Sequence, residues 1–357
     1  MVLAALVLLG LPARAESVKD AVEAIDFSSW QQSVDEAGGG LDVGSLVLSL
    51  AEGGLELSPE KIAQLLRELV SSEARSLSGQ LIALCAPALL WAVNRQLSRM
   101  GAASGLVCYL AGAGVMMSVF AGQLQLMTAA AQRVGQLAGQ VFPVLSSLMS
   151  ATGRAGTAGL MQPLIAFAGG TMAQAAGQIG RVLGGSAAVL AVAGNLSGRI
   201  SLKGLHKLCC SAGNWLLGGV MTVFLGLASL CGAMGRAQDG LSVRAAKYAV
   251  DNLLPAVGGD VADAMDAMAS SALLVKNAAG VTGAAALVAV CVRPVVQLAL
   301  GMLTFRLAAA VAEPVADGPL KKCMEQLAQA SQLLLAALAV CMSVFLSLIG
   351  MVLGGGA

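Results

Sequence analysis

The sequence predicts an all-α fold: a polytopic α-helical integral membrane protein with about seven transmembrane helices (range about six to nine) and an amphipathic helical hairpin. The first observation is composition. Of 357 residues, 57% are hydrophobic and only 11% are charged, whereas soluble domains carry about 25% charged residues. The second is the set of long uncharged runs, several near the ~20 residues that cross a bilayer. The third is a charged stretch, 240–276, that lies between two of these runs.

The charges divide the chain into a polar head and a membrane region. Residues 16–76 hold twelve acids and four bases, and no acid occurs between Glu73 and Asp239. The charges that interrupt the uncharged runs in that interval are all Arg or Lys. An acidic head therefore precedes a membrane region that is punctuated by cations alone.

The first fifteen residues, MVLAALVLLGLPARA, are predicted to be a signal peptide that is cleaved after Ala15. The alternative is a short first anchor, but its apolar run is too short to span. Residues 16–78 then form an exported acidic region. Within it an amphipathic helix is expected over 58–76, because Ser58 can cap it, Pro59 suits its first position and Glu60 lies in its first turn. This helix would lie on the outer membrane surface or on a partner.

The membrane spans are bounded by the charges. A bundle over 79–239 is expected to hold about six spans, and a C-terminal region over 277–357 two to three more. Arg306 lies inside the run 295–312, which is expected to be re-entrant because this keeps Lys321 and Lys322 inside, as the positive-inside rule requires. Pro143 and Pro163 are expected to kink their spans. The predicted spans are 81–93, 101–122, 134–151, 155–176, 182–198, 208–234, 277–292, 295–312 and 326–353.

Catalytic chemistry is not expected. The chain has one histidine, His206, which is expected to lie in a basic loop without a catalytic role. No acid is available at membrane depth before Asp239. It has no phosphate-binding loop and no basic patch interleaved with aromatic residues, so neither a nucleotide nor nucleic acid is an expected ligand. The eight cysteines contain no CxxC pair and read as small apolar residues. We therefore expect no enzyme, no cofactor and no metal.

Two further patterns bear on packing. Glutamines within or between spans, such as Gln123, Gln125, Gln162, Gln174 and Gln178, can line a pore but more often bridge helices. Six GxxxG pairs occur (40/44, 101/105, 135/139, 180/184, 194/198 and 350/354). Random placement of 44 glycines predicts about five, so the motif count carries no signal.

The charged stretch reads as an extracytoplasmic amphipathic hairpin over 240–276. Its first helix has an apolar stripe and an opposite stripe with Arg244, Lys247 and Asp251. Pro255 ends this helix, and Gly258 with Gly259 permits a turn. A second helix follows, with acids in its early turns where the helix dipole favours them. The two apolar stripes need burial, so an interaction element at the membrane surface is favoured over a solvated loop.

Several stretches together resemble the stage III sporulation protein AE family, strongest after Leu217. The first is R-x-x-K-x-x-x-x-N-x-x-P from Arg244, and the second is LVKN-x-x-G from Leu274. The third is FRLAAA from Phe305, followed by EP and GP pairs. The candidate interaction or structural residues are Arg244, Lys247, Asp251, Asn252, Pro255, Gly258, Asp263, Lys276, Asn277, Gly280, Arg306 and Pro314.

The resemblance implies a multi-pass protein of the mother-cell membrane around the forespore, with its N-terminal region extracytoplasmic. It implies a role in a trans-envelope channel or feeding complex that supports late forespore gene expression. The partners would be other membrane proteins of the same sporulation operon, a forespore partner protein and the lipid bilayer, with no nucleic acid, and oligomerisation is compatible with this role. A stand-alone small-solute permease and a non-conducting assembly scaffold are the alternatives.

Overall fold

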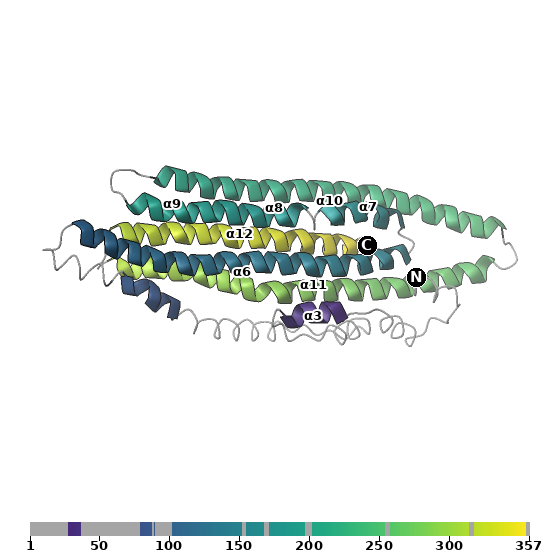
Figure 1. Ribbon diagram of the computed structural model, residues 1–357. Coiled ribbons are helices and arrows are strands. Elements are labelled where there is room, and N and C mark those ends of the chain that lie inside the picture. Colours follow the sequence, from purple (N-terminus) through teal and green to yellow (C-terminus); the bar gives the residue numbers. More distant parts are fainter. Residues whose placement is uncertain are drawn as a thin grey trace.

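The fold was examined in a computed structural model, which describes residues 28–36, 79–87, 89, 102–151, 155–167, 171–196, 202–253, 258–313 and 318–354. These residues are almost entirely helical, and no strand occurs among them (Figure 1). Residues 79–87 form a short helix. The other elements are α3 (Ser28–Glu36), α6 (Ala102–Ala151), α7 (Ala155–Phe167), α8 (Ala173–Ile179), the π-helix η2 (Gly180–Gly184), α9 (Gly185–Leu196), α10 (Lys203–Leu253), α11 (Gly258–Ala312) and α12 (Pro319–Gly354).

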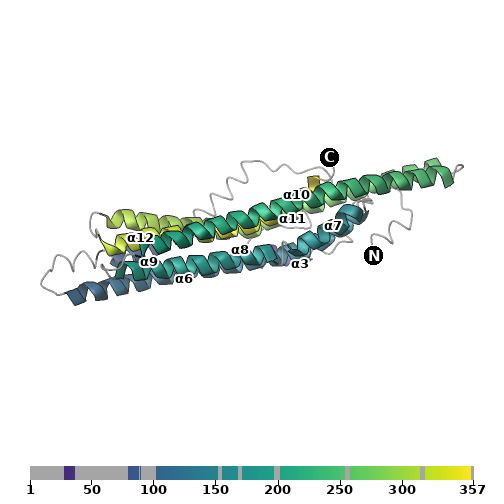
Figure 2. The same cartoon turned by 90° about the horizontal axis from the view of Figure 1, so that it is seen from above.

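The long helices run alongside one another and form two layers (Figure 2). One layer contains α6 and the row α7, α8, η2 and α9; the other contains α10, α11 and α12. Helix α12 packs against α6, α8, α9, α10 and α11. The short helix α3 lies across α6 and α11 and buries Trp30 and Val34. The buried side chains of each long helix therefore pack against α12 or against a helix next to α12.

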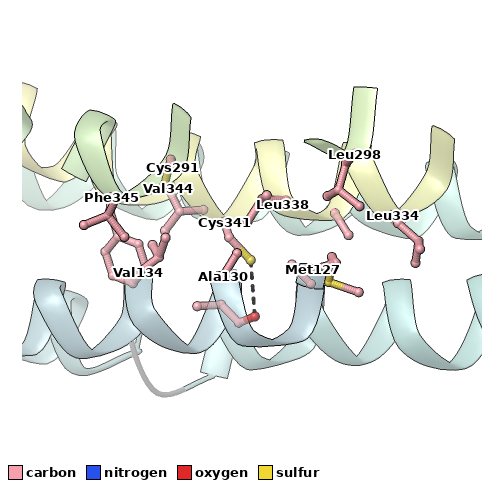
Figure 3. Packing of buried hydrophobic residues seen from close by; sticks show 14 of the residues in the cluster. Met127, Ala130, Val134, Cys291, Leu298, Leu334, Leu338, Cys341, Val344 and Phe345 are labelled. Atoms are coloured by element: carbon pink, nitrogen blue, oxygen red, sulfur yellow. Dashed lines mark hydrogen bonds between the residues drawn. The ribbon is translucent and has the colours of Figure 1, made fainter. Parts of the chain in front are cut away.

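The core follows α12, which buries two positions in almost every turn. Among them are Leu334, Leu338, Cys341 and Phe345 (Figure 3). The Phe345 ring packs on Phe142 of α6 with centroids 6.1 Å apart. Small and apolar residues on all sides of a helix are typical of one that is surrounded by other helices. In a bilayer such a core is held by close van der Waals packing more than by exclusion of water.

The predicted all-α membrane fold is confirmed: five helices of the described chain are long and apolar enough to cross a membrane. They cover 105–150, 173–196, 203–235, 273–312 and 319–353. The predicted spans 101–122 and 134–151 are parts of one helix, α6, which continues through Pro143. Pro143 is exposed, so the lost backbone hydrogen bond falls on the outer side of the helix, where the backbone can bend.

The C-terminal spans are also continuous. Helix α11 runs through Pro294 without a break, so the predicted runs 277–292 and 295–312 form one element and no re-entrant turn divides them. The predicted boundary between 155–176 and 182–198 also moves, because α7 ends at Phe167 and α8 begins at Ala173. Charges and prolines that look like boundaries in the sequence thus lie inside helices whose other faces are well packed.

The hairpin has the two predicted helices, but they are the ends of longer ones. Helix α10 continues beyond its candidate membrane span, 203–235, and ends at Leu253. Helix α11 begins at Gly258. Both project beyond the ends of α6 and α12 (Figure 1). The signal peptide 1–15 and the helix 58–76 lie outside the described residues. Helix α3, by contrast, was not expected, since 16–57 shows little periodicity in its sequence.

Candidate functional site

The hairpin carries most of the predicted site residues. Arg244, Lys247, Asp251 and Asn252 lie in the last turns of α10. Gly258 is the first residue of α11, and Asp263 follows in its second turn. Pro255 and Pro314 lie outside the described residues. The backbone thus brings the basic arm and the acidic arm to the same projecting end of the molecule (Figure 1).

Two other predicted residues, Lys276 and Gly280, meet the C-terminal end of α12. Lys276 is completely buried, and its Nζ donates a hydrogen bond to the carbonyl oxygen of Val352 at 3.1 Å. The last carbonyls of a helix lack partners within that helix and carry its negative dipole end. Gly280 lies against Leu353, so a side chain at this position would collide with α12. This close approach places Lys276 where it can cap α12.

Asn277 is beside this contact. Its Oδ1 is buried and has no hydrogen-bond partner among the described residues. A buried acceptor without a partner costs about 1–3 kcal/mol, so it is not a feature that packing alone would select. The sequence placed these residues at the start of a span. The structure places them at the junction between two helices.

A second polar contact lies in the middle of the core. Gln123 of α6 accepts a hydrogen bond from the Ser331 hydroxyl of α12 at 2.5 Å. The Gln123 amide packs directly on Gly301 of α11, and its Nε2 has no partner among the described residues. This glutamine bridges helices, as favoured from the sequence. Four others, Gln125, Gln162, Gln174 and Gln178, are exposed and do not.

His206 is not a loop residue, contrary to the interpretation of the sequence. It lies in the first turn of α10, is buried, and its Nε2 is 3.1 Å from the backbone oxygen of Gln326. Asn195 of α9 donates to Oε1 of the same glutamine at 2.7 Å, and the Tyr109 hydroxyl donates to the Val192 oxygen at 2.7 Å. These contacts tie α6, α9, α10 and α12 together at one end. No local pattern could have found them, because the partners are 83 to 131 residues apart.

Arg306 lies on the exposed side of α11 and donates to Oε1 of Gln332 on α12 at 3.3 Å. At the same end Lys321 pairs with Glu313 at 2.7 Å. No group of three or more His, Cys, Asp or Glu side chains in the described part of the chain is placed to hold a metal ion. The polar contacts found are those that position helices.

Comparison with known proteins identifies relatives of this chain. The model of the family described as stage III sporulation protein AE matches residues 41–356. The chain is 29% identical over 216 residues to a protein of Bacillus subtilis (strain 168) named stage III sporulation protein AE. That match covers 60% of this chain and 54% of the relative, about half of its length. No solved structure matches.

Proposed function

Because the chain belongs to the stage III sporulation protein AE family, we propose that it is a membrane component of a sporulation-specific channel or feeding complex. The complex would join the mother cell to the forespore and support late forespore gene expression. The family match over nearly the whole chain carries this proposal.

The architecture is compatible with such a role. Helices of 51 and 55 residues reach about 77 and 83 Å at 1.5 Å per residue, whereas the hydrocarbon layer is about 30 Å thick. A large part of α10 and α11 must therefore extend outside the bilayer. Elements of this length suit a component that crosses one membrane and reaches toward a second.

The charge distribution suggests an orientation. Lys203 and Lys207 begin α10, and Lys321 and Lys322 begin α12. These helix starts lie at the same end of the bundle, opposite the hairpin (Figure 1). The positive-inside rule assigns that end to the mother-cell cytoplasm. The hairpin would then face the space between the two membranes. There it can meet other membrane proteins of the same operon and a forespore partner.

Deletion of the gene in its own host tests the proposal. We expect growth to be unchanged, a late forespore reporter to fall silent, and few heat-resistant spores to form. Re-expression of the intact chain should restore both readouts, and a tagged copy should co-purify with other sporulation membrane proteins. Normal spores after deletion would refute the proposal. A purified chain that moves a solute in liposomes without partners would instead favour a stand-alone permease.

A further inference from the structure

Beyond its first turns, α6 exposes none of the large apolar side chains that a lipid-facing helix carries. The exposed large apolar residues of α6 are Leu106, Val107 and Leu110, all in its first turns. From Gly114 onward the exposed positions hold only small or polar residues or proline. They are Gly114, Ser118, Ala121, Gly122, Gln125, Ala129, Gln132, Arg133, Gln136, Gly139, Pro143, Ser147 and Ser150.

Exposed polar side chains also occur on α8 and η2, the neighbours of α6 in its layer (Figure 2), although Val182 of η2 is exposed as well. A Cβ atom added at Gly177 of α8 would lie 3.9 Å from the Cβ atom of Ala131 on α6. The two helices are therefore in direct contact. Gln174, Gln178 and Arg181 are exposed on this row. We call the surface formed by Gln125, Gln132, Arg133, Gln136, Gln174, Gln178 and Arg181 the polar face.

The opposite layer shows where the bilayer lies along the bundle. Helix α10 exposes large apolar residues from Leu205 to Met234, with Leu208 63%, Trp215 79% and Leu230 62% exposed. This run is about 45 Å long at 1.5 Å per residue, which covers the hydrocarbon layer of about 30 Å. Exposed side chains of this kind are suited to lipid.

Contacts with α12 put the polar face at the same depth as this apolar run. Gly213 of α10 lies against Leu333, and Gly232 of α10 lies against Met351. Gly180, next to Arg181, lies against Ala337. Along α12, Ala337 lies between Leu333 and Met351. Arg181 is therefore level with the middle of the apolar run of α10. Arg133 lies nearby, because Met127 of α6 also meets Gly180.

Neither arginine has an acidic partner in the described chain. No ion pair is formed by Arg133 or Arg181 there, and the sequence has no acid between Glu73 and Asp239. A guanidinium that faces lipid at this depth is strongly disfavoured. A second copy that packed the same face would bring arginines together without a counter-charge. Water and mobile anions satisfy these groups where lipid and a second copy do not.

We propose that the polar face lines a water-filled passage for small anionic solutes, closed by further chains of the complex. Rings of Arg or Lys are the chemistry of anion-conducting pores. This inference rests on the proposed function, since one chain exposes the face but does not enclose it. The amide side chains supply donors and acceptors along the passage, and the two arginines select for negative charge.

Cysteine modification in membranes from sporulating host cells tests the passage. Gln132→Cys and Gln178→Cys place thiols on the polar face, and Leu208→Cys and Leu230→Cys are matched controls on α10. Each full-length variant is treated with an anionic sulfonate thiol reagent or a cationic trimethylammonium one. Peptide mass spectrometry reads the introduced residue directly, so the native cysteines can stay. We expect the anionic reagent to modify the polar-face thiols at least about tenfold faster, by focusing of the local field, and the controls to stay unmodified.

A second comparison isolates the arginines. Arg133→Gln combined with Arg181→Gln should leave the polar-face thiols reactive but remove the preference for the anionic reagent. Unreactive thiols, equal rates for both reagents in the parent, or a disulfide between copies through Gln132→Cys would each overturn the passage. The labelling does not depend on spore formation. It can therefore fail while the deletion phenotype still supports membership in the sporulation complex.

Discussion

At the scale of single residues, Lys276 is a charged side chain that is buried and hydrogen-bonded between two helices. Its side chain is completely buried, and its Nζ donates to the Val352 carbonyl in the last turn of α12. The bond joins two helices whose neighbouring residues, Gly280 and Leu353, touch. A donor at the C-terminal end of a helix offsets carbonyls that have no partner within it.

We expect Lys276→Met to destabilise the purified protein by about 1–3 kcal/mol, because the substitution leaves the buried Val352 carbonyl without its donor. Thermal unfolding in detergent, followed by size-exclusion chromatography, measures the change. Lys322→Met is the matched control, since Lys322 is exposed on α12, and it should unfold near the parent temperature. Equal stability of the two variants would mean that the hydrogen bond does not hold α12.

Sequence reasoning could single out Lys276, Asn277 and Gly280 but could not say what they touch. Their pattern carries the family resemblance, and it is local. Their partner is the end of a helix more than seventy residues later. His206 shows the same limit more sharply. A lone histidine among basic residues reads as a loop residue, and only the tertiary contact with Gln326 reveals that it is buried.

At the scale of elements, close helix contact depends on particular glycines and not on the GxxxG motif. Of the predicted pairs, Gly180 and Gly184 both face α12. An added Cβ at Gly180 would come within 2.8 Å of the Ala337 side chain, and one at Gly184 within 2.8 Å of Leu334. Gly135 and Gly139 have the same spacing, yet nothing lies within 4 Å of either. The four-residue spacing alone therefore does not show which glycine pair contacts another helix.

We expect Gly180→Ala to destabilise the protein by about 1–3 kcal/mol, because Ala337 has no flexible end that can move aside. Gly184→Ala should cost less, since the Leu334 methyl can rotate away. Gly139→Ala should be neutral or stabilising by up to about 1 kcal/mol, from helix propensity alone. Chemical denaturation of the four purified proteins gives the order. A Gly139→Ala variant as unstable as Gly180→Ala would contradict the packing described.

The element boundaries mark where sequence reasoning was right and where it failed. The hairpin helices were predicted because charge, periodicity and Pro255 coincide there. The division of α6 was not correct, because Arg133 looks like the end of a span although only one face of the helix carries it. An arginine on an exposed stripe does not interrupt a helix whose opposite stripe is buried. The burial of one helix face depends on tertiary packing. Hydropathy averaged along the sequence does not distinguish the two faces of a helix.

At the scale of the whole molecule, length is the dominant property. The layers are much longer than a bilayer is thick, and α10 and α11 extend furthest (Figure 1). These two helices carry the hairpin well beyond the part that contacts α12 (Figure 2). In the orientation proposed above, this end lies outside the cytoplasm.

We therefore expect cysteines at Ser242 and Ser270 to react with a membrane-impermeant thiol reagent in intact mother-cell protoplasts. Each would be introduced singly into the full-length chain, and reaction would be read by peptide mass spectrometry. Lys203→Cys, at the other end of α10, is the control and should react only after lysis. The reverse pattern would place the hairpin in the cytoplasm and remove the basis for its proposed partners.

The central place of α12 has a consequence for biosynthesis. Helices α6 to α11 precede it in the chain, and all of them except α7 pack against it. While these helices are being inserted, Gln123 has no Ser331 to meet and the Val352 carbonyl is not yet available to Lys276. Contacts among α6, α7, α9, α10 and α11 can form before α12 is inserted, whereas every contact with α12 has to form afterwards. The core around α12 is therefore completed last, and its completion depends on a single segment.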